Sequence, residues 1–294
     1  MEWYTCVALI DIGIAYLAWC TLQAVFATFV AHLVGFALVV YAYCNWKPKA
    51  WPSFRSLSVW QWFRKQYWLV DVNGLPLDAL RPEARDHIYM YAIAPHGLYA
   101  SGTTIYFGLN NAYQNVVLMA SSMLFWIPLL REFSAWGGAQ PATRQNIKQA
   151  IQNKKDVAIV PESLRGVMHP GKSLEIIKGK TTGKPRTGFI ECALDMVEKG
   201  HNISIVPLWI QGQDDMYNVW IPFPRLSSFL LRKTYYAWPL FAFGFTWVPF
   251  WPKPVKLTYW FGKPIELKRG DKVLDVLDVY CDALQQEMEK ANEG

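Results

Sequence analysis

The stretch IYMYAIAPHGLYASGT, residues 88–103, has the pattern of a buried strand that ends on a histidine. Its first seven residues are apolar or aromatic, which favours a strand covered on both faces. Pro95, His96 and Gly97 follow directly, and the residues after them are uncharged. No charged side chain lies within several positions of His96, so a polar partner for this histidine has to come from another part of the chain.

Short apolar runs alternate with helical patterns from residue 87 onward. The candidate strands are 88–94, 115–120, 156–161, 203–208 and 255–261. Helices are predicted at 143–153, at 187–199 and along the apolar stripe of 273–288. Thr143 is the expected N-cap of the first helix, and Gly200 is the expected stop of the second. Strands that alternate with helices predict an α/β domain with a mostly parallel sheet flanked by helices.

Polar residues gather at the predicted ends of three of these strands. His96 ends the first strand, Glu162 ends the third in AIVPESLRG, and Pro207 closes the fourth in SIVPLWIQGQDD. In open α/β sheets, ligands bind in the crevice beyond the carboxyl ends of the strands. If the strands are parallel, a base, an acid and a polar loop therefore share one site.

The N-terminal segment is far more apolar than the rest. Residues 4–44 contain Asp11 as their one charged side chain. A single helix of that length would be about 60 Å long, twice the hydrocarbon thickness of a bilayer. We therefore expect a transmembrane helical hairpin over residues 1–45 that turns near Thr21–Gln23. Five cations follow it and place both ends on the cytosolic side: Lys47, Lys49, Arg55, Arg64 and Lys65.

The segment WKPKAWPSFRSLSVWQWFRKQYW, residues 46–68, interleaves aromatic and basic side chains. This pattern is typical of a helix in the headgroup layer, and an aromatic connector packed on the domain is the alternative. The predicted organisation is thus an anchor over 1–45, an interfacial or connecting segment over 46–86 and an α/β domain over 87–294.

Composition narrows the class of protein. The chain is 52% hydrophobic, 16% aromatic and 18% charged, with a net charge of +6. The basic residues are dispersed, which fits anionic headgroups or a phosphate-rich substrate better than nucleic acid. The cysteines have neither CxxC nor zinc-type spacing, so we predict free thiols and no structural metal: Cys6, Cys20, Cys44, Cys192 and Cys281.

His96 suits general base catalysis, because an unperturbed imidazole titrates near neutral pH. The lipase motif GxSxG is absent, and GKSLE at 171–175 lacks the second glycine. A histidine base without a protein nucleophile fits direct attack by an acceptor alcohol on an activated acyl donor. The expected chemistry is acyl transfer without a covalent enzyme intermediate.

Ordered blocks resemble the type 2 diacylglycerol acyltransferase family, which includes monoacylglycerol and wax-ester acyltransferases. APHGLYASGT is similar to the family's HPHG block, and VPESLRGVMHPGKSLEI to its GGAxES block with the downstream PGK. Further similar stretches are REFSAWGGAQPATRQNI, RTGFIECALDM, VPLWIQGQDDMY and WVPFWPKPVKLTYWFGKPIEL. The resemblance covers roughly residues 45–290. VPESLR is also similar to a block of the wider glycerolipid acyltransferase superfamily.

The chain departs from these patterns at several positions. Ala94 replaces the first histidine of HPHG, and the two glycines before the acidic residue are missing. Asp214 and Asp215 stand where the family has Asn-Glu in FGENE. In the superfamily an Asp follows the catalytic His by five positions, where this chain has Ser101, so Glu162 becomes the leading carboxylate partner for His96.

The resemblance implies transfer of a long acyl chain from acyl-CoA to diacylglycerol or monoacylglycerol, which would make triacylglycerol or a related neutral lipid. His96 would take the hydroxyl proton, and Glu162 would orient or charge-stabilise it. Pro95, Gly97 and Ser163 would form the active-site loop that holds the oxyanion. No cofactor is expected, because acyl-CoA is a substrate. Candidate cations for its phosphates are Arg165, Lys172, Lys178, Lys180, Lys184 and Arg186.

The apolar stretch 235–251 could enter the bilayer, line an acyl tunnel or form a buried loop. A lysophospholipid or wax-ester acyltransferase is an alternative enzyme, and a lipid-droplet or membrane-shaping hairpin protein with a decayed site is the non-enzyme alternative. The expected location is the endoplasmic reticulum membrane with a cytosolic catalytic domain, extending to lipid droplets. The expected partners are acyl-CoA, a lipid alcohol and the bilayer, with a homo-oligomer left open and no nucleic acid.

Overall fold

The structure is a computed structural model, and it divides the chain into two compact units, Met1–Pro48 and Lys49–Gly294. Each unit is described by itself. The residues that the structure describes are 2–74, 86–162, 165–169, 171–181, 183–234, 241–245 and 251–293.

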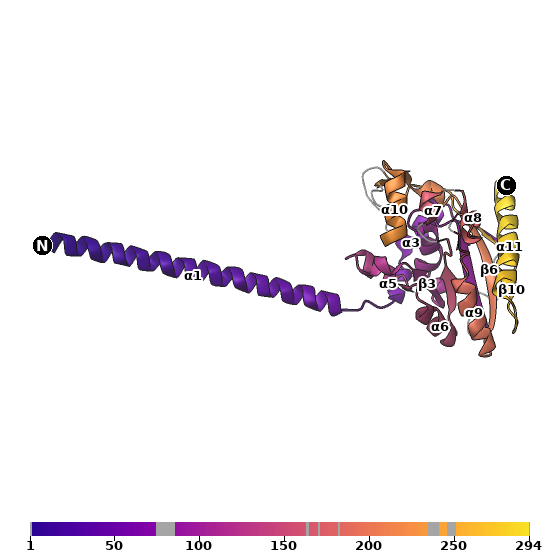
Figure 1. Cartoon of the computed structure of the whole chain (residues 1–294), viewed down its shortest axis with the longest axis horizontal. Helices are drawn as coiled ribbons and strands as arrows, with labels where there is room; N and C mark the ends of the chain where they lie inside the picture. The colour runs from indigo at the N-terminus through magenta and orange to yellow at the C-terminus, as the bar shows by residue number, and fades with distance from the viewer. Residues whose placement is uncertain are drawn as a thin grey trace. The chain divides into compact units, whose positions relative to one another are not determined.

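The first unit is one long helix, α1, which runs from Glu2 to Asn45 (Figure 1). The predicted hairpin is wrong, because the helix passes through Thr21–Gln23 without a break. That segment holds neither Gly nor Pro, so nothing there interrupts the ladder of backbone hydrogen bonds. Within the described residues, one helical segment is long and apolar enough to cross a membrane, Trp19–Asn45, with a mean hydropathy of 2.1.

The second unit is built on a mixed sheet with the strand order β1-β9-β6-β2-β5-β3-β4, and β10 also pairs with β6. Its strands are β1 (Asp71–Asn73), β2 (His87–Ala94), β3 (Val116–Ala120), β4 (Ala139–Pro141), β5 (Asp156–Ile159), β6 (Asn202–Gln211), β9 (Thr258–Phe261) and β10 (Ile265–Glu266). A separate pair joins β7 (Asn218–Trp220) to β8 (Phe241–Phe243). The five predicted strands all correspond to strands of the main sheet.

The centre of the sheet is parallel, as predicted. β2 lies between β5 and β6, with Met90 opposite both Val157 and Ile205. Since β5, β3 and β4 also pair in parallel, the carboxyl ends of these strands meet at one edge. The exceptions are β9 and β10, which run antiparallel to β6, and β1, which runs parallel to β9.

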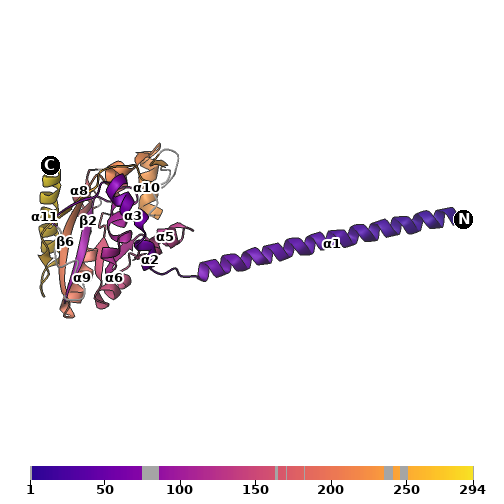
Figure 2. The same cartoon turned by 180° about the vertical axis from the view of Figure 1, so that it is seen from behind.

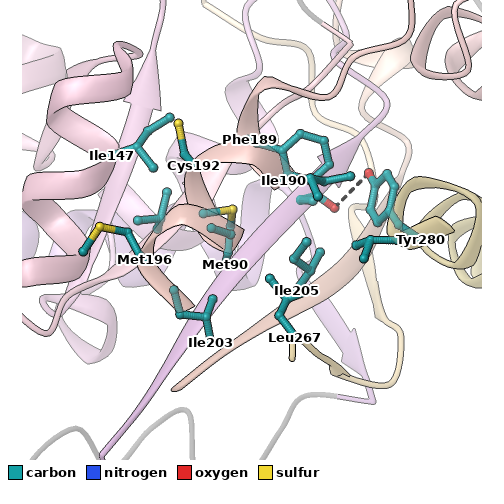
Figure 3. Close-up of a cluster of buried hydrophobic side chains, with 14 of the residues drawn as sticks. Met90, Ile147, Phe189, Ile190, Cys192, Met196, Ile203, Ile205, Leu267 and Tyr280 are labelled. Carbon is teal, nitrogen blue, oxygen red and sulfur yellow. Dashed lines mark hydrogen bonds between the residues drawn. The ribbon is translucent and has the colours of Figure 1, made fainter. Parts of the chain in front are cut away.

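One face of the sheet is covered by α6 (Arg144–Gln152), α8 (Ser173–Ile177), α9 (Gly188–Glu198) and α11 (Val273–Glu293). Their apolar stripes meet the sheet side chains in a continuous core, in which Met90, Ile205 and Tyr280 are fully buried (Figure 3). The predicted cap is present, because the Thr143 hydroxyl accepts the N–H of Asn146 at 3.1 Å. The helices predicted at 143–153, 187–199 and 273–288 are confirmed as α6, α9 and α11.

The other face is covered by the chain between β2 and β3, which forms α4 (Ser101–Thr103), η4 (Thr104–Gly108) and η5 (Asn111–Tyr113). Residues 49–70 pack against this side of the unit as α2 (Pro52–Arg55), α3 (Ser58–Trp62) and η1 (Phe63–Tyr67), which corresponds to the alternative of an aromatic connector packed on the domain. Arg55 is buried there and donates to the carbonyls of Phe107 at 2.6 Å and Tyr113 at 2.8 Å. β1 then joins the edge of the sheet beside β9.

The remaining elements surround the carboxyl edge of the sheet. They are η6 (Ser122–Phe125), α5 (Leu130–Trp136), α7 (Arg165–Met168), η7 (Asp214–Met216) and α10 (Pro224–Thr234). In the second unit, α10, α3 and α5 lie on one side and α11 lies on the opposite side (Figures 1 and 2). Of the stretch 235–251, β8 is described, whereas 235–240 and 246–250 lie outside the described residues.

Candidate active site

His96 lies two residues beyond the end of β2, at the carboxyl edge of the sheet. Its Nδ1 is 2.7 Å from the carbonyl oxygen of Gly97. A carbonyl oxygen can only accept, so Nδ1 carries the proton and Nε2 keeps its lone pair. Burial lowers the pKa of His96 below its usual range, and the Gly97 contact opposes this effect. The imidazole is therefore neutral at pH 7 and can accept a proton.

Glu162 reaches the same turn from the segment after β5. Its Oε2 accepts the backbone N–H of His96 at 2.9 Å, and the residue is 2% exposed. The carboxyl therefore contacts the backbone of His96, while the imidazole has Gly97 as its partner. Burial raises the pKa of Glu162 to about 7, although the N–H of His96 acts in the opposite direction.

Gly166 is required by the position of the Glu162 carboxyl. A Cβ at residue 166 would lie 2.0 Å from Oε1 of Glu162, far inside the contact distance of real Cβ atoms. The backbone of α7 therefore closes over the carboxyl, and a glycine makes that approach possible.

The segment after β6 also holds the histidine turn. The buried side-chain amide of Gln213 donates to the carbonyl of Pro95. The carboxylate of Asp214 accepts the N–H of Gly97. Burial, and to a lesser extent the neighbouring Asp215, raise the pKa of Asp214, and the contact with Gly97 opposes this rise. The Gly97 amide, expected to hold an oxyanion, thus already has an acceptor. Pro95 has no N–H, and Ser163 lies outside the described residues.

Sequence reasoning missed Gln213 because it ended the strand at Pro207, whereas β6 continues to Gln211. Residue 207 falls between the part of β6 that pairs with β10 and the part that pairs with β9. A proline is tolerated at this change of partner, and its carbonyl accepts the N–H of Gly262 at 2.8 Å. The polar run QGQDD was the available signal.

A cavity of about 930 Å³ opens beside His96. Its wall is mostly apolar and comes from the segments after β2, β3 and β5, together with α6 and α9. Thr103 lines it, is 6% exposed, and its hydroxyl has no hydrogen-bond partner among the described residues. A buried hydroxyl of this kind is suited to a polar group of a bound molecule.

Two arginines also line the cavity, Arg186 and Arg144. Arg186 was expected at the site, whereas Arg144 was not. Arg144 is mostly exposed and pairs with Glu191, whose other oxygen accepts the Thr187 hydroxyl at 2.6 Å. The start of α9 therefore holds an arginine at the cavity wall.

Among the other predicted cations, those with a described side chain do not line the cavity. Lys172 pairs with Glu175 at 3.8 Å, and Lys178 with Asp282 of α11 at 3.4 Å. Lys180 and Lys184 are exposed, and the Arg165 side chain lies outside the described part of the chain. Across the described ranges, no group of three or more His, Cys, Asp or Glu side chains is placed to hold a metal ion.

Several curated relatives match somewhat more than half of the chain. Acyl-CoA wax alcohol acyltransferase 2 from Homo sapiens is 26% identical over 188 residues, which cover 59% of this chain and 52% of that protein. Diacylglycerol O-acyltransferase 1 from Saccharomyces cerevisiae is 24% identical over 60% of this chain and 39% of its own length. Diacylglycerol O-acyltransferase 2 from Xenopus tropicalis is 26% identical, over 55% and 44% respectively. The chain thus spans about half, or less, of the length of these relatives.

A crystal structure of the 1-acyl-sn-glycerophosphate acyltransferase PlsC from Thermotoga maritima superposes with a TM-score of 0.42 at 11% identity, over 81% of this chain and 77% of that one. The family model described as diacylglycerol acyltransferase matches residues 23–292. This match covers most of the chain and confirms the resemblance found in its motifs. The chain belongs to the diacylglycerol acyltransferase family.

Proposed function

We propose that this protein is a membrane-bound acyltransferase that moves a long acyl chain from acyl-CoA to the hydroxyl of diacylglycerol or monoacylglycerol, making a neutral lipid. The observation that carries the proposal is His96, whose unprotonated Nε2 belongs to a side chain that lines a large, mostly apolar cavity. Membership of the diacylglycerol acyltransferase family supports the same chemistry.

In the proposed reaction, Nε2 of His96 takes the proton of the acceptor hydroxyl as its oxygen attacks the thioester carbonyl. A C–O bond forms, and the carbonyl electron pair moves onto oxygen. When the tetrahedral intermediate collapses, the C–S bond breaks and the thiolate of CoA takes the proton from the imidazolium. Ester and free CoA are the products, and the histidine returns to its neutral form.

Glu162 acts in this proposal as a positioning residue. Its carboxyl holds the N–H of His96, and Gln213 holds the carbonyl of Pro95, so the turn presents the imidazole from a fixed backbone. Thr103 is the group we propose to donate to the oxyanion, because the residue lines the cavity and its buried hydroxyl has no hydrogen-bond partner among the described residues. Arg186 and Arg144 are the proposed contacts for the phosphates of CoA.

The proposed site of action is the endoplasmic reticulum membrane, with the catalytic unit in the cytosol and access to lipid droplets. The apolar segment Trp19–Asn45 supports membrane attachment, since its 27 residues exceed the roughly 20 needed to span a bilayer. Acceptor and product are insoluble in water, so attachment would let both diffuse to and from the site within the lipid.

The test uses membranes from cells without their own neutral-lipid acyltransferases, expressing wild type or His96→Gln. Labelled oleoyl-CoA is supplied with diacylglycerol, monoacylglycerol, a fatty alcohol or lysophosphatidate. We expect a labelled neutral ester whose rate of formation falls by about 10²–10⁴ in the variant.

His87→Gln is the matched control, because His87 lies at the other end of β2 and contacts Ser204 at 2.8 Å, away from the cavity. Labelled phosphatidate would identify the protein as a lysophospholipid acyltransferase, and a labelled wax ester would identify it as a wax-ester acyltransferase. Absence of every product, with normally folded protein, would contradict the proposal.

A further inference from the structure

Apolar side chains are exposed on the catalytic unit in three chain segments. The first is α2–α3, the second joins η6 to α5, and the third comprises β7, α10 and β8. We call their exposed apolar residues the aromatic face: Trp51, Leu57, Val59, Trp62, Trp126, Ile127, Leu129, Val219, Trp220, Phe223, Leu226, Phe229, Phe241 and Phe243. Trp126 and Leu129 are 84% and 81% exposed, which is exceptional for large apolar side chains.

The elements that carry the aromatic face lie on one side of the catalytic unit. In both views α10, α3 and α5 are grouped together, and α11 is on the opposite side (Figures 1 and 2). Ring contacts also join these segments. Phe54 of α2 packs on Phe133 of α5 with centroids 5.6 Å apart, and Tyr67 of η1, which follows α3, contacts Phe245 just beyond β8 at 6.2 Å. The elements that carry the exposed apolar residues are therefore neighbours.

These side chains are exposed because the elements bury other residues. Phe223, just before α10, and Leu226 and Phe229 on α10 are exposed, while Ser227 is fully buried. In the β7–β8 pair, Trp220 lies opposite Phe241 with ring centroids 5.5 Å apart. Exposed aromatic side chains beside a buried serine are the reverse of the distribution that is usual in soluble proteins.

Acidic residues are absent from the same parts of the sequence. Residues 46–70, 87–131 and 216–265 contain neither Asp nor Glu, although the chain has 23 of them. The exposed cations Lys65 and Arg225 lie in these ranges. In contrast, α11 exposes acidic residues on the other side: Asp275, Asp278, Asp282, Glu289 and Glu293. Acidic residues are therefore distributed unevenly between the two sides of the unit.

The aromatic face is continuous with the cavity at His96. Ile127 is 42% exposed and also lines the cavity, next to Leu124 and Leu130 of the same segment. A molecule that leaves an apolar phase at this surface can thus reach the cavity along apolar side chains.

We infer that the aromatic face is a second lipid-binding surface, which lays the catalytic unit on a bilayer with anionic headgroups. Exposed Trp and Phe partition to the membrane interface, and nearby Lys and Arg are attracted to anionic lipid. A protein partner would require no such depletion of acids over three segments. The inference rests on the membrane attachment proposed above, but it is independent of the acyl-transfer step.

The test places one fluorescent label at a time in the full-length chain. The background replaces Cys6, Cys20 and Cys44 with serine, while Cys192 and Cys281 stay buried in the core. Cysteines are introduced as Trp126→Cys, Trp220→Cys or Phe229→Cys, and as Leu274→Cys on α11 for the matched control, because Leu274 is 58% exposed on the opposite side. Each is labelled with a polarity-sensitive dye and reconstituted into phosphatidylcholine–phosphatidylserine vesicles that contain nitroxide on the acyl chains.

We expect the three labels on the aromatic face to shift their emission to shorter wavelength and to lose intensity to the lipid nitroxide, while the label at 274 does neither. The double variant Arg225→Glu, Lys65→Glu should weaken the quenching at residue 229 in vesicles with phosphatidylserine and leave it unchanged in phosphatidylcholine alone.

Two results would overturn the inference. Labels at 126, 220 and 229 that are quenched by aqueous iodide and not by the lipid nitroxide would show that water covers the face. Labels that are shielded from both quenchers, increasingly so at higher protein-to-lipid ratio, would show that a second copy of the chain covers it. Loss of acyl transfer in the proposed assay would not change these readings, so the two proposals fail separately.

Discussion

At residue scale, the site depends on how one turn of backbone is held. Side chains from the segments after β5 and β6 form hydrogen bonds with the backbone of Pro95 and His96. The imidazole of His96 donates to the carbonyl of Gly97. The positive φ of Gly97, 58°, allows this tight conformation, and a Cβ there would meet Cγ of Gln213 at 2.8 Å. Precision at His96 thus comes from backbone contacts made by other parts of the chain.

Glu162→Gln should change the pH dependence of stability. The pKa of Glu162 is about 7 in the folded state, above its usual value of 4.5. The folded state therefore holds this proton more tightly than the unfolded state does. The contribution of Glu162 to the free energy of unfolding is largest below about pH 4.5 and is lost as the pH rises through about 7. The loss is on the order of 3 kcal/mol. Glutamine still accepts the His96 N–H but does not ionise, so the thermal midpoint in detergent should fall less between about pH 5 and about pH 8 than in the wild type. Parallel curves would contradict the buried, raised pKa.

Thr103→Val should lower kcat by about ten-fold or more with little change in KM, because an oxyanion donor acts mainly in the transition state. The substitution keeps the shape of the side chain and removes its hydroxyl. Thr103→Ser is the matched control and should retain most of the activity. Equal activity of the valine and serine variants would exclude the hydroxyl from the reaction.

At the scale of elements, the sequence located the strands and helices that have long apolar patterns. The strands 88–94 and 156–161, and the helices 143–153 and 187–199, are present close to their expected bounds. Short edge strands such as β1 and β4 were missed, since three residues carry too little periodicity to be recognised. The hairpin was inferred from length alone and is replaced by one continuous helix.

Gly166→Ala tests how α7 positions the Glu162 carboxyl. The new Cβ would clash with Oε1, so the carboxyl should move away from the His96 N–H. We expect kcat to fall although Glu162 and His96 are both still present. Gly137→Ala is the control, because its Cβ would have no neighbour closer than 3.5 Å. If kcat falls equally in both variants, the cause is a general effect on folding, and the displaced carboxyl is excluded as the explanation.

At the scale of the whole molecule, an apolar helix is joined to a catalytic unit that has its own exposed aromatic face. Within its own unit, the helical segment Trp19–Asn45 exposes large apolar side chains along its length, among them Phe26, Phe36 and Tyr41. Exposed apolar surface of this extent is stable only in an apolar environment, which is the physical basis for the proposed membrane attachment.

Leu33→Arg combined with Phe36→Arg should release the chain from the membrane. Each arginine near the centre of a spanning helix costs about 2.5–3.5 kcal/mol of insertion free energy. The wild type should stay in the pellet after alkaline carbonate extraction, and the variant should move to the supernatant. Leu33→Ile with Phe36→Leu is the control and should remain in the pellet. Retention of the arginine variant in the pellet would contradict the proposal that α1 is the segment that resists carbonate extraction.

The sequence by itself determined the family and the α/β class and indicated His96 and Glu162 as candidate site residues, because motifs and apolar periodicity are local properties of the chain. Only the tertiary structure decided that Glu162 holds the backbone of His96 and that Gln213 and Asp214 join it, since these contacts connect residues 66 to 118 positions apart. The cavity, its Thr103 hydroxyl and the aromatic face were likewise visible only after folding, because each collects side chains from several strands or helices. Short motifs indicate which reactive side chains the chain contains, whereas the position and environment of each side chain depend on the packing of distant segments.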